Sequence, residues 1–154
     1  MTDYRNYIFD LYGTLVDIHT NESKASLWKN MAGIYSMMGA AYTSSELKKQ
    51  YKNLAEEEFD RALRRAGAKF GKEKFAGEET EILLDQVFGR LFLKKGIKAN
   101  KGQITQTGIV FRSLSTEYIR LFDGVPELLS RLKTAGKKIY LLSNAQRMFT
   151  EPEM

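Results

Sequence analysis

Two short apolar runs near opposite ends of the 154-residue chain constrain its fold most strongly. Residues 7–9 (YIF) lead into Asp10, and residues 139–142 (IYLL) lead into a serine and an asparagine. Short, continuous apolar runs that end at polar residues are typical of strands buried on both faces of a parallel sheet. We therefore predict one strand within residues 5–12 and a second within residues 137–144.

The chain between these runs reads almost entirely as helix. Asn21 or Thr20 is expected to cap the first helix, Thr43 with Glu46 to form a capping box for the second, and Gly67 to end it. Residues 67–79 are rich in glycine and charge and are predicted to form a loop. Apolar residues recur at helical spacing in four segments, which are residues 27–38, 47–63, 82–91 and 104–122.

A compact unit then leads into the second strand. Asp123 and Gly124 predict a turn, and Pro126 suits the first turn of a helix because its missing N–H is not needed there. Gly136 is expected to end that helix. The order is the helix-to-strand half of a parallel α/β unit.

Composition excludes several classes of protein. The content is 43% hydrophobic and 28% charged, which is globular rather than disordered. The absence of cysteine excludes a disulfide scaffold, cysteine-ligated zinc and a thiol nucleophile. No run is long enough for a membrane span, and the first residues do not resemble a secretory signal, so a cytoplasmic location is expected by default. The net charge of +5 is too small to indicate a nucleic-acid partner, although it can favour anionic substrates.

The strongest local motif is FDLYGTLVD at residues 9–17. An aspartate at the carboxyl end of a parallel strand lies where α/β sheets bind ligands, and Gly13 permits a sharp turn whose backbone N–H groups can converge on an anion. Thr14 adds a hydroxyl there. Asp10 is therefore a candidate nucleophile or metal ligand. The structural alternative is that Asp10 caps a turn.

This motif resembles the first motif of the haloacid dehalogenase-like (HAD) hydrolase superfamily. Residues 141–146 (LLSNAQ) resemble the second motif of that superfamily, and residues 122–144 resemble the usual approach to it. The helical stretch after the first motif is similar to the inserted helical cap. The resemblance implies an α/β fold with a Rossmann-like core, formed by residues 1–16 and 118–154, and a helical cap of residues 17–117.

The resemblance also implies roles for particular residues. Asp10 would be the nucleophile that forms a covalent aspartyl intermediate, and Thr14 would position the nucleophile or the anion. The backbone at Leu11 and Tyr12 would cradle the transferred group. In members that use Mg²⁺, Asp10 and the carbonyl of Tyr12 would bind the metal.

In the second motif, the resemblance implies that Ser143 hydrogen-bonds a phosphoryl group or a substrate carboxylate. Asn144 would orient the substrate. The implied partner is a small anionic molecule; neither nucleic acid nor a membrane is expected, and the sequence does not indicate the oligomeric state.

Two departures from the family pattern matter. Tyr12 stands where phosphatase members commonly carry an aspartate as general acid, and the Asp-x-Tyr-Gly-Thr form is typical of 2-haloacid dehalogenases. In addition, the family's third motif, a Lys or Arg, and its acidic fourth motif do not follow Ser143 in recognisable form. Arg147 is too close to Ser143, and Glu151 and Glu153 lack a preceding apolar strand. The expectation is therefore a partial core, truncated at its C-terminus.

These considerations leave three hypotheses. The first is a Mg²⁺-dependent phosphatase acting on a small phosphorylated metabolite, because phosphatases are the commonest members of the superfamily. The second is a metal-independent 2-haloacid dehalogenase, which Tyr12 favours. The third is that the 154-residue chain is a catalytically impaired fragment or a binding module built on the helical segment.

Overall fold

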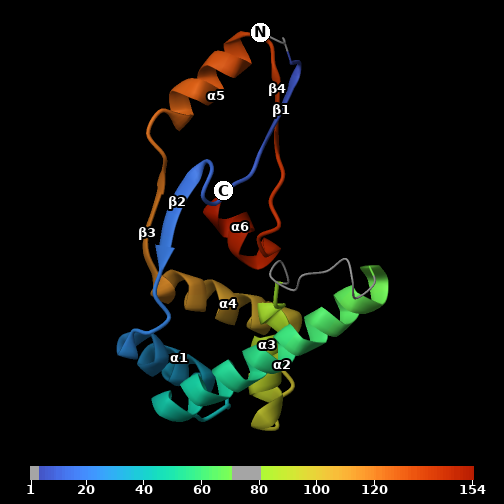
Figure 1. Ribbon diagram of the computed structural model, residues 1–154. Coiled ribbons are helices and arrows are strands. Elements are labelled where there is room, and N and C mark those ends of the chain that lie inside the picture. Colours follow the sequence, from blue (N-terminus) through green and yellow to red (C-terminus); the bar gives the residue numbers. More distant parts are fainter. Residues whose placement is uncertain (1–3, 71–80) are drawn as a thin grey trace.

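The computed structural model describes residues 4–70 and 81–154 (Figure 1). The elements, in chain order, are β1 (Asn6–Phe9), β2 (Val16–Thr20), α1 (Ala25–Met37), α2 (Ser44–Phe70), α3 (Leu84–Lys94), α4 (Lys101–Ser115), β3 (Thr116–Leu121), α5 (Val125–Thr134), β4 (Lys138–Leu141) and α6 (Arg147–Glu153). Helices α1 to α4 gather at one end of the molecule, and β1, β4 and α5 lie at the other. The fold is α/β, a partial Rossmann-like core with a helical insertion.

Strands β1 and β4 pair in parallel, as predicted. Their register places Asn6 opposite Lys138 and Phe9 opposite Leu141. Helix α5 precedes β4 and packs against it, so the predicted helix-to-strand unit is confirmed. Parallel strands need a long crossover connection. In this chain the helical insertion is part of that connection.

The prediction that these two strands are buried on both faces is wrong. Ile8 on β1 is 64% exposed, and Leu142, just after β4, is 70% exposed. Each strand has one strand neighbour within the described residues, and α5 is the helix packed on β4. The apolar side chains of these two strands are therefore largely exposed in this structure.

Two further strands interrupt the stretch that the sequence analysis assigned to helix. Strand β2 pairs antiparallel with β3, with Val16 opposite Leu121 and His19 opposite Tyr118. The prediction of a helix through residues 116–122 is therefore wrong, since α4 ends at Ser115. The segment TEYIRL is rich in β-branched and aromatic residues, which fit a pleated strand once a partner strand is available.

The large buried cluster lies among the helices rather than on the parallel sheet. Tyr35, Phe88 and Phe92 are each at most 1% exposed, and the ring centroids of Tyr35 and Phe92 are 4.5 Å apart. Trp28 packs against Phe111 in the same cluster. The main helices of the cluster are α1, α2, α3 and α4. The helical periodicity of these segments thus correctly indicated a packed core.

The C-terminal helix α6 also packs against this cluster. It packs against α4, and its Phe149 is buried in the helical cluster. Gly108 on α4 allows the close approach, because a Cβ there would lie 2.4 Å from the sulfur of Met148. The C-terminal helix therefore connects the second motif to the helical insertion.

The predicted helix ends are partly confirmed. Thr43 accepts a hydrogen bond from the backbone N–H of Glu46, as expected for the start of α2. Pro126 lies in the first turn of α5, and Gly136 follows that helix with a φ of 69°. Asn21 does not cap α1, because Lys24 stands at the N-cap position and the Asn21 side chain instead accepts from Ser23.

Gly67 does not end α2, which runs on to Phe70. The predicted loop at residues 67–79 is therefore wrong for residues 67–70, and the rest of it lies outside the described residues. The predicted domain boundaries, at 16/17 and 117/118, fall inside the paired strands β2 and β3. No helix in residues 4–70 or 81–154 is long and apolar enough to cross a membrane.

Candidate active site at the first motif

Asp10 directly follows β1, at the carboxyl end of the parallel pair. The backbone N–H of Leu142 donates to the carbonyl of Phe9 at 2.8 Å, so the chain after β4 leaves the sheet at the same edge. Asp10 is exposed, and within the described part of the chain its carboxylate has no hydrogen-bond or ion-pair partner. A free carboxylate at this edge is available to a ligand, which does not favour the turn-capping alternative.

The loop between β1 and β2 is a tight turn built on Gly13. Gly13 has a φ of 76°, a left-handed conformation that favours glycine. The N–H of Gly13 donates to Val16, and the N–H groups of Leu15 and Val16 both donate to Leu11, each at 2.9 Å. These three amides are therefore used by the loop itself. The expectation that the amides of this turn converge on an anion is wrong for these three.

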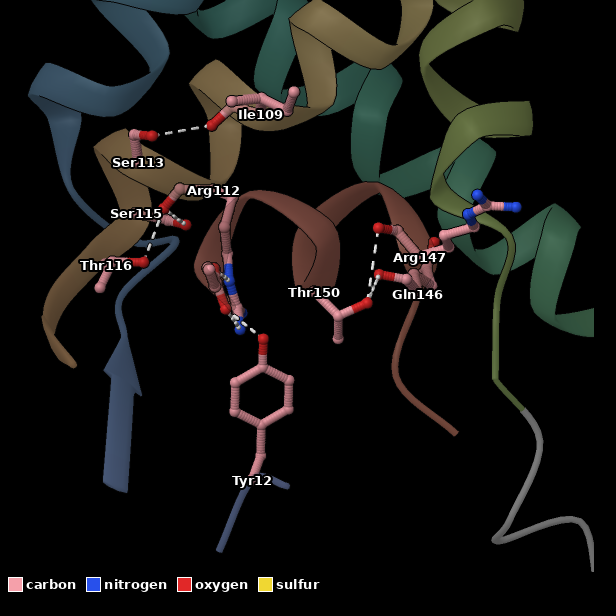
Figure 2. Close-up of polar contacts among 10 residues, drawn as sticks. Tyr12, Ile109, Arg112, Ser113, Ser115, Thr116, Gln146, Arg147 and Thr150 are labelled. Atoms are coloured by element: carbon pink, nitrogen blue, oxygen red, sulfur yellow. Dashed lines mark hydrogen bonds and ion pairs between the residues drawn. The ribbon is translucent and has the colours of Figure 1, made fainter. Parts of the chain in front are cut away.

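Within this loop the side chains of the first motif have different surroundings. Leu11 is buried, whereas Thr14 is exposed and leaves its hydroxyl open to solvent. Tyr12 is half-buried and points toward the helices (Figure 2). The motif thus presents Asp10 and Thr14 to solvent and uses Leu11 and Tyr12 for contacts inside the molecule.

The Tyr12 hydroxyl donates a hydrogen bond to the carboxylate of Glu153 on α6. Arg112 of α4 holds the same carboxylate, with 2.8 Å between Nε and Oε1 (Figure 2). Burial of Tyr12, followed by the hydrogen bond and charge of Glu153, raises the pKa of Tyr12 to about 12. Tyr12 therefore keeps its proton at neutral pH and is a poor general acid.

Sequence reasoning missed Arg112 altogether and rejected Glu153 as a member of the acidic fourth motif. Tyr12 and Glu153 are 141 positions apart, and Arg112 is 41 positions from Glu153. No spacing rule connects residues on a loop and two different helices at such separations. The polar cluster of Tyr12, Arg112 and Glu153 therefore depends on how α4 and α6 pack.

The second motif lies where the sequence analysis placed it, after β4. Ser143 is half-buried and its hydroxyl oxygen accepts from the N–H of Ala145 at 3.3 Å, while Asn144 is exposed. Gln146, which follows, accepts from the N–H of Leu84 at the start of α3. The segment that carries the second motif is thus tied to the helical insertion.

The described residues supply few ligands for a Mg²⁺ ion. Within residues 4–70 and 81–154, no group of three or more His, Asp or Glu residues is placed to hold a metal ion. Asp10 and the Tyr12 carbonyl would supply two oxygen ligands, whereas Mg²⁺ requires about six, several of which are commonly water.

The cavity found beside α6 is not the Asp10 site. It has a volume of about 860 Å³, a size that suits a small molecule, and is lined by residues of α3, α4 and α6. Gln146, Arg147 and Met148 contribute to its wall, but residues 10–14 do not.

Comparison with known protein families decides the identity. A family model described as haloacid dehalogenase-like hydrolase matches residues 4–152. The chain belongs to the haloacid dehalogenase-like hydrolases. A search of curated proteins gives no significant match.

The match confirms the resemblance drawn from the two motifs, and it covers both strands of the parallel pair and the whole helical insertion. Membership supports a hydrolase in general terms. Within this HAD-like hydrolase, the roles of Asp10, Leu11, Tyr12, Thr14, Ser143 and Asn144 stay predictions.

Proposed function

We propose that this HAD-like hydrolase acts on a small anionic substrate through a covalent intermediate on Asp10. The observation that carries the proposal is the position of Asp10, which is exposed, unpaired among the described residues, and directly after a strand of the parallel pair. The carboxyl ends of parallel strands are where α/β sheets bind ligands. A carboxylate in that position is free to attack an electrophile.

In the phosphatase form, an oxygen of Asp10 attacks the phosphorus atom of a phosphorylated metabolite. The bond to the substrate oxygen breaks, and the leaving alkoxide takes a proton from water. Water then hydrolyses the aspartyl phosphate, which releases phosphate and restores the carboxylate. Thr14 and Ser143 are proposed to hydrogen-bond the transferred group, the backbone at Leu11 and Tyr12 to contact it, and Asn144 to orient the rest of the substrate.

The second candidate is a 2-haloacid dehalogenase, and the state of Tyr12 favours it. Its hydroxyl donates to Glu153, and its pKa is raised to about 12, chiefly by burial. Such a group does not readily protonate a leaving alkoxide. In the dehalogenase form Asp10 attacks the carbon that bears the halogen, halide leaves without a proton, and water hydrolyses the resulting ester to a 2-hydroxy acid.

The covalent step is tested by a single-turnover reaction in water enriched in oxygen-18, with mass spectrometry of the peptide that contains Asp10. In the dehalogenase form we expect the heavy oxygen in Asp10, because water attacks the carbonyl carbon of the aspartyl ester. In the phosphatase form water attacks phosphorus, so we expect a phosphorylated Asp10 peptide in the acid-quenched reaction instead. Asp10→Asn should abolish turnover of substrate, while Asp85→Asn, in the first turn of α3, is the matched control. In the dehalogenase form, oxygen-18 found only in the product, with Asp10 unlabelled, would rule out the covalent intermediate. In the phosphatase form, the absence of a phosphorylated Asp10 peptide after an acid-quenched single turnover would rule it out.

The substrate class is tested separately. A phosphatase should release phosphate from an aryl phosphate and should lose activity with EDTA, with recovery on addition of Mg²⁺; Asp10 and the carbonyl of Tyr12 would then be the protein ligands to examine. A dehalogenase should release halide from a 2-haloalkanoate in the presence of EDTA. Absence of turnover on both substrates would favour the third hypothesis, that the chain is a catalytically impaired fragment or a binding module.

A further inference from the structure

The Glu153 carboxylate lies between two groups that are suited to bind an anion. Arg112 contacts it through two nitrogens, with 2.8 Å from Nε to Oε1 and 3.5 Å from Nη2 to Oε2. Tyr12 donates its hydroxyl to Oε2. A guanidinium that faces both oxygens of one carboxylate is an arrangement that also suits the oxygens of a phosphoryl group.

The Arg112 guanidinium lies near two aromatic rings. Its central carbon lies 5.2 Å from the ring centroid of Tyr12 and 5.3 Å from that of Phe149. The side chain is 20% exposed, so the cation is partly shielded from water and its interactions with anions are strengthened. The charge of Arg112 also reaches Glu22, where burial raises the carboxyl pKa and Arg112 opposes that rise.

Arg112 lies in the last turn of α4, where a positive charge is favoured by the unpaired carbonyls of the helix C-terminus. The helix therefore stabilises the Arg112 cation independently of Glu153.

We propose that the Tyr12 hydroxyl and the Arg112 guanidinium form a binding site for the oxyanion of the substrate, and that Glu153 fills this site as an internal anion until substrate replaces it. The identification of the anion as substrate rests on the proposed function, since Tyr12 is two residues from Asp10. The oxyanion is a phosphoryl group in a phosphatase or a carboxylate in a dehalogenase. Arg112 would also link the helical insertion to the first motif when substrate binds.

The test is calorimetric titration of the full chain with inorganic phosphate and, separately, with propionate. Glu153→Gln removes the competing charge and keeps the shape of the side chain, so we expect the Kd for the preferred anion to fall about tenfold. Arg112→Gln should raise that Kd at least about tenfold, and Arg112→Lys, which keeps the charge but loses the fork, should lie between. Glu151→Gln, which removes the exposed partner of Arg147 on the same helix, is the matched control and should not change the Kd.

The two main variants change affinity in opposite directions, so a general loss of folding cannot imitate the result. Tighter binding of phosphate than propionate identifies a phosphoryl site, and the reverse identifies a carboxylate site. The proposal is overturned if Glu153→Gln binds neither anion more tightly than the parent, or if Arg112→Gln binds as tightly as the parent. Anion binding that depends on Arg112, without turnover of any substrate, would support this site and reject the proposed function. Turnover that is unchanged by Arg112→Gln would support the proposed function and reject this site.

Discussion

At the scale of single residues, Tyr12 shows how one side chain acquires a property that its type does not have. A tyrosine side chain ordinarily has a pKa of about 10. Partial burial, together with the Glu153 carboxylate, moves that pKa to about 12, while the nearby Arg112 cation opposes the shift. The motif identified Tyr12 as part of the candidate site. The charged groups that affect its pKa come from α4 and α6, which the motif does not include.

The raised pKa of Tyr12 predicts a dependence of stability on alkaline pH. Below about pH 10 Tyr12 is protonated in both the folded and the unfolded chain, so its contribution to the free energy of unfolding is fully present. Between about pH 10 and the folded pKa of about 12, the unfolded chain loses the proton first. The free energy of unfolding should therefore fall as pH rises through this window.

This is checked by urea unfolding of the parent and Tyr12→Phe at a series of pH values. We expect the parent to lose stability more steeply than the variant between pH 10 and 12, and the two slopes to agree between pH 7 and 9. Tyr42, whose pKa burial also raises to about 12, is present in both proteins and cancels in the comparison. Equal slopes across the alkaline window would contradict the assigned environment of Tyr12.

At the scale of elements, local signals succeeded where the interaction is local. The Pro126 helix start and the Gly136 helix end were predictable because each depends on backbone conformation within a few residues. Strand β3 was not, because the periodicity of its apolar residues also suits a helix and its partner β2 lies on the far side of the helical insertion. The pairing of the two strands decided between the alternatives.

The start of α4 offers a clean test of a local interaction. Asn100 accepts from the N–H of Gln103, and the Gln103 side chain accepts from the N–H of Asn100, so both halves of a capping box are present. Asn100→Ala should lower the free energy of unfolding by about 1 kcal/mol, because it exposes an unpaired N–H in the first turn. Chemical denaturation measures this, with the exposed Lys98→Ala as control.

Asn100→Asp should restore most of the lost stability, since aspartate is an equally good cap and its charge suits a helix N-terminus. If Asn100→Ala were no less stable than Lys98→Ala, the capping box would not contribute measurably to α4.

At the scale of the whole molecule, stability is unevenly distributed. The buried cluster of aromatic and aliphatic side chains belongs to the helices and α6, whereas β1 and β4 are largely exposed on a two-stranded sheet. Regions with few buried apolar contacts open at lower free energy than a packed core. The candidate nucleophile Asp10 thus lies beside the less stable part of the molecule.

Hydrogen exchange should reveal this difference directly. We expect the backbone amides of β4 and α5 to exchange faster than those of α1 and α3, after correction for intrinsic rates, because they open without disrupting the helical cluster. Binding of phosphate or propionate should slow exchange around Tyr12 if the anion bridges the loop and α4. Equal protection throughout the described residues would show instead that the molecule unfolds as one cooperative unit.

The sequence by itself determined the family, the parallel pairing of the two apolar runs, and the position of Asp10 and Ser143 after those strands. These features depend on contiguous motifs and on short-range backbone preferences, which can be recognised from one sequence. The exposure of β1 and β4, the pairing of β2 with β3, and the cluster of Tyr12, Arg112 and Glu153 were decided only by the tertiary structure. Each depends on which distant segments pack together, and the free energy of such contacts is set by burial and partner geometry that no local pattern contains.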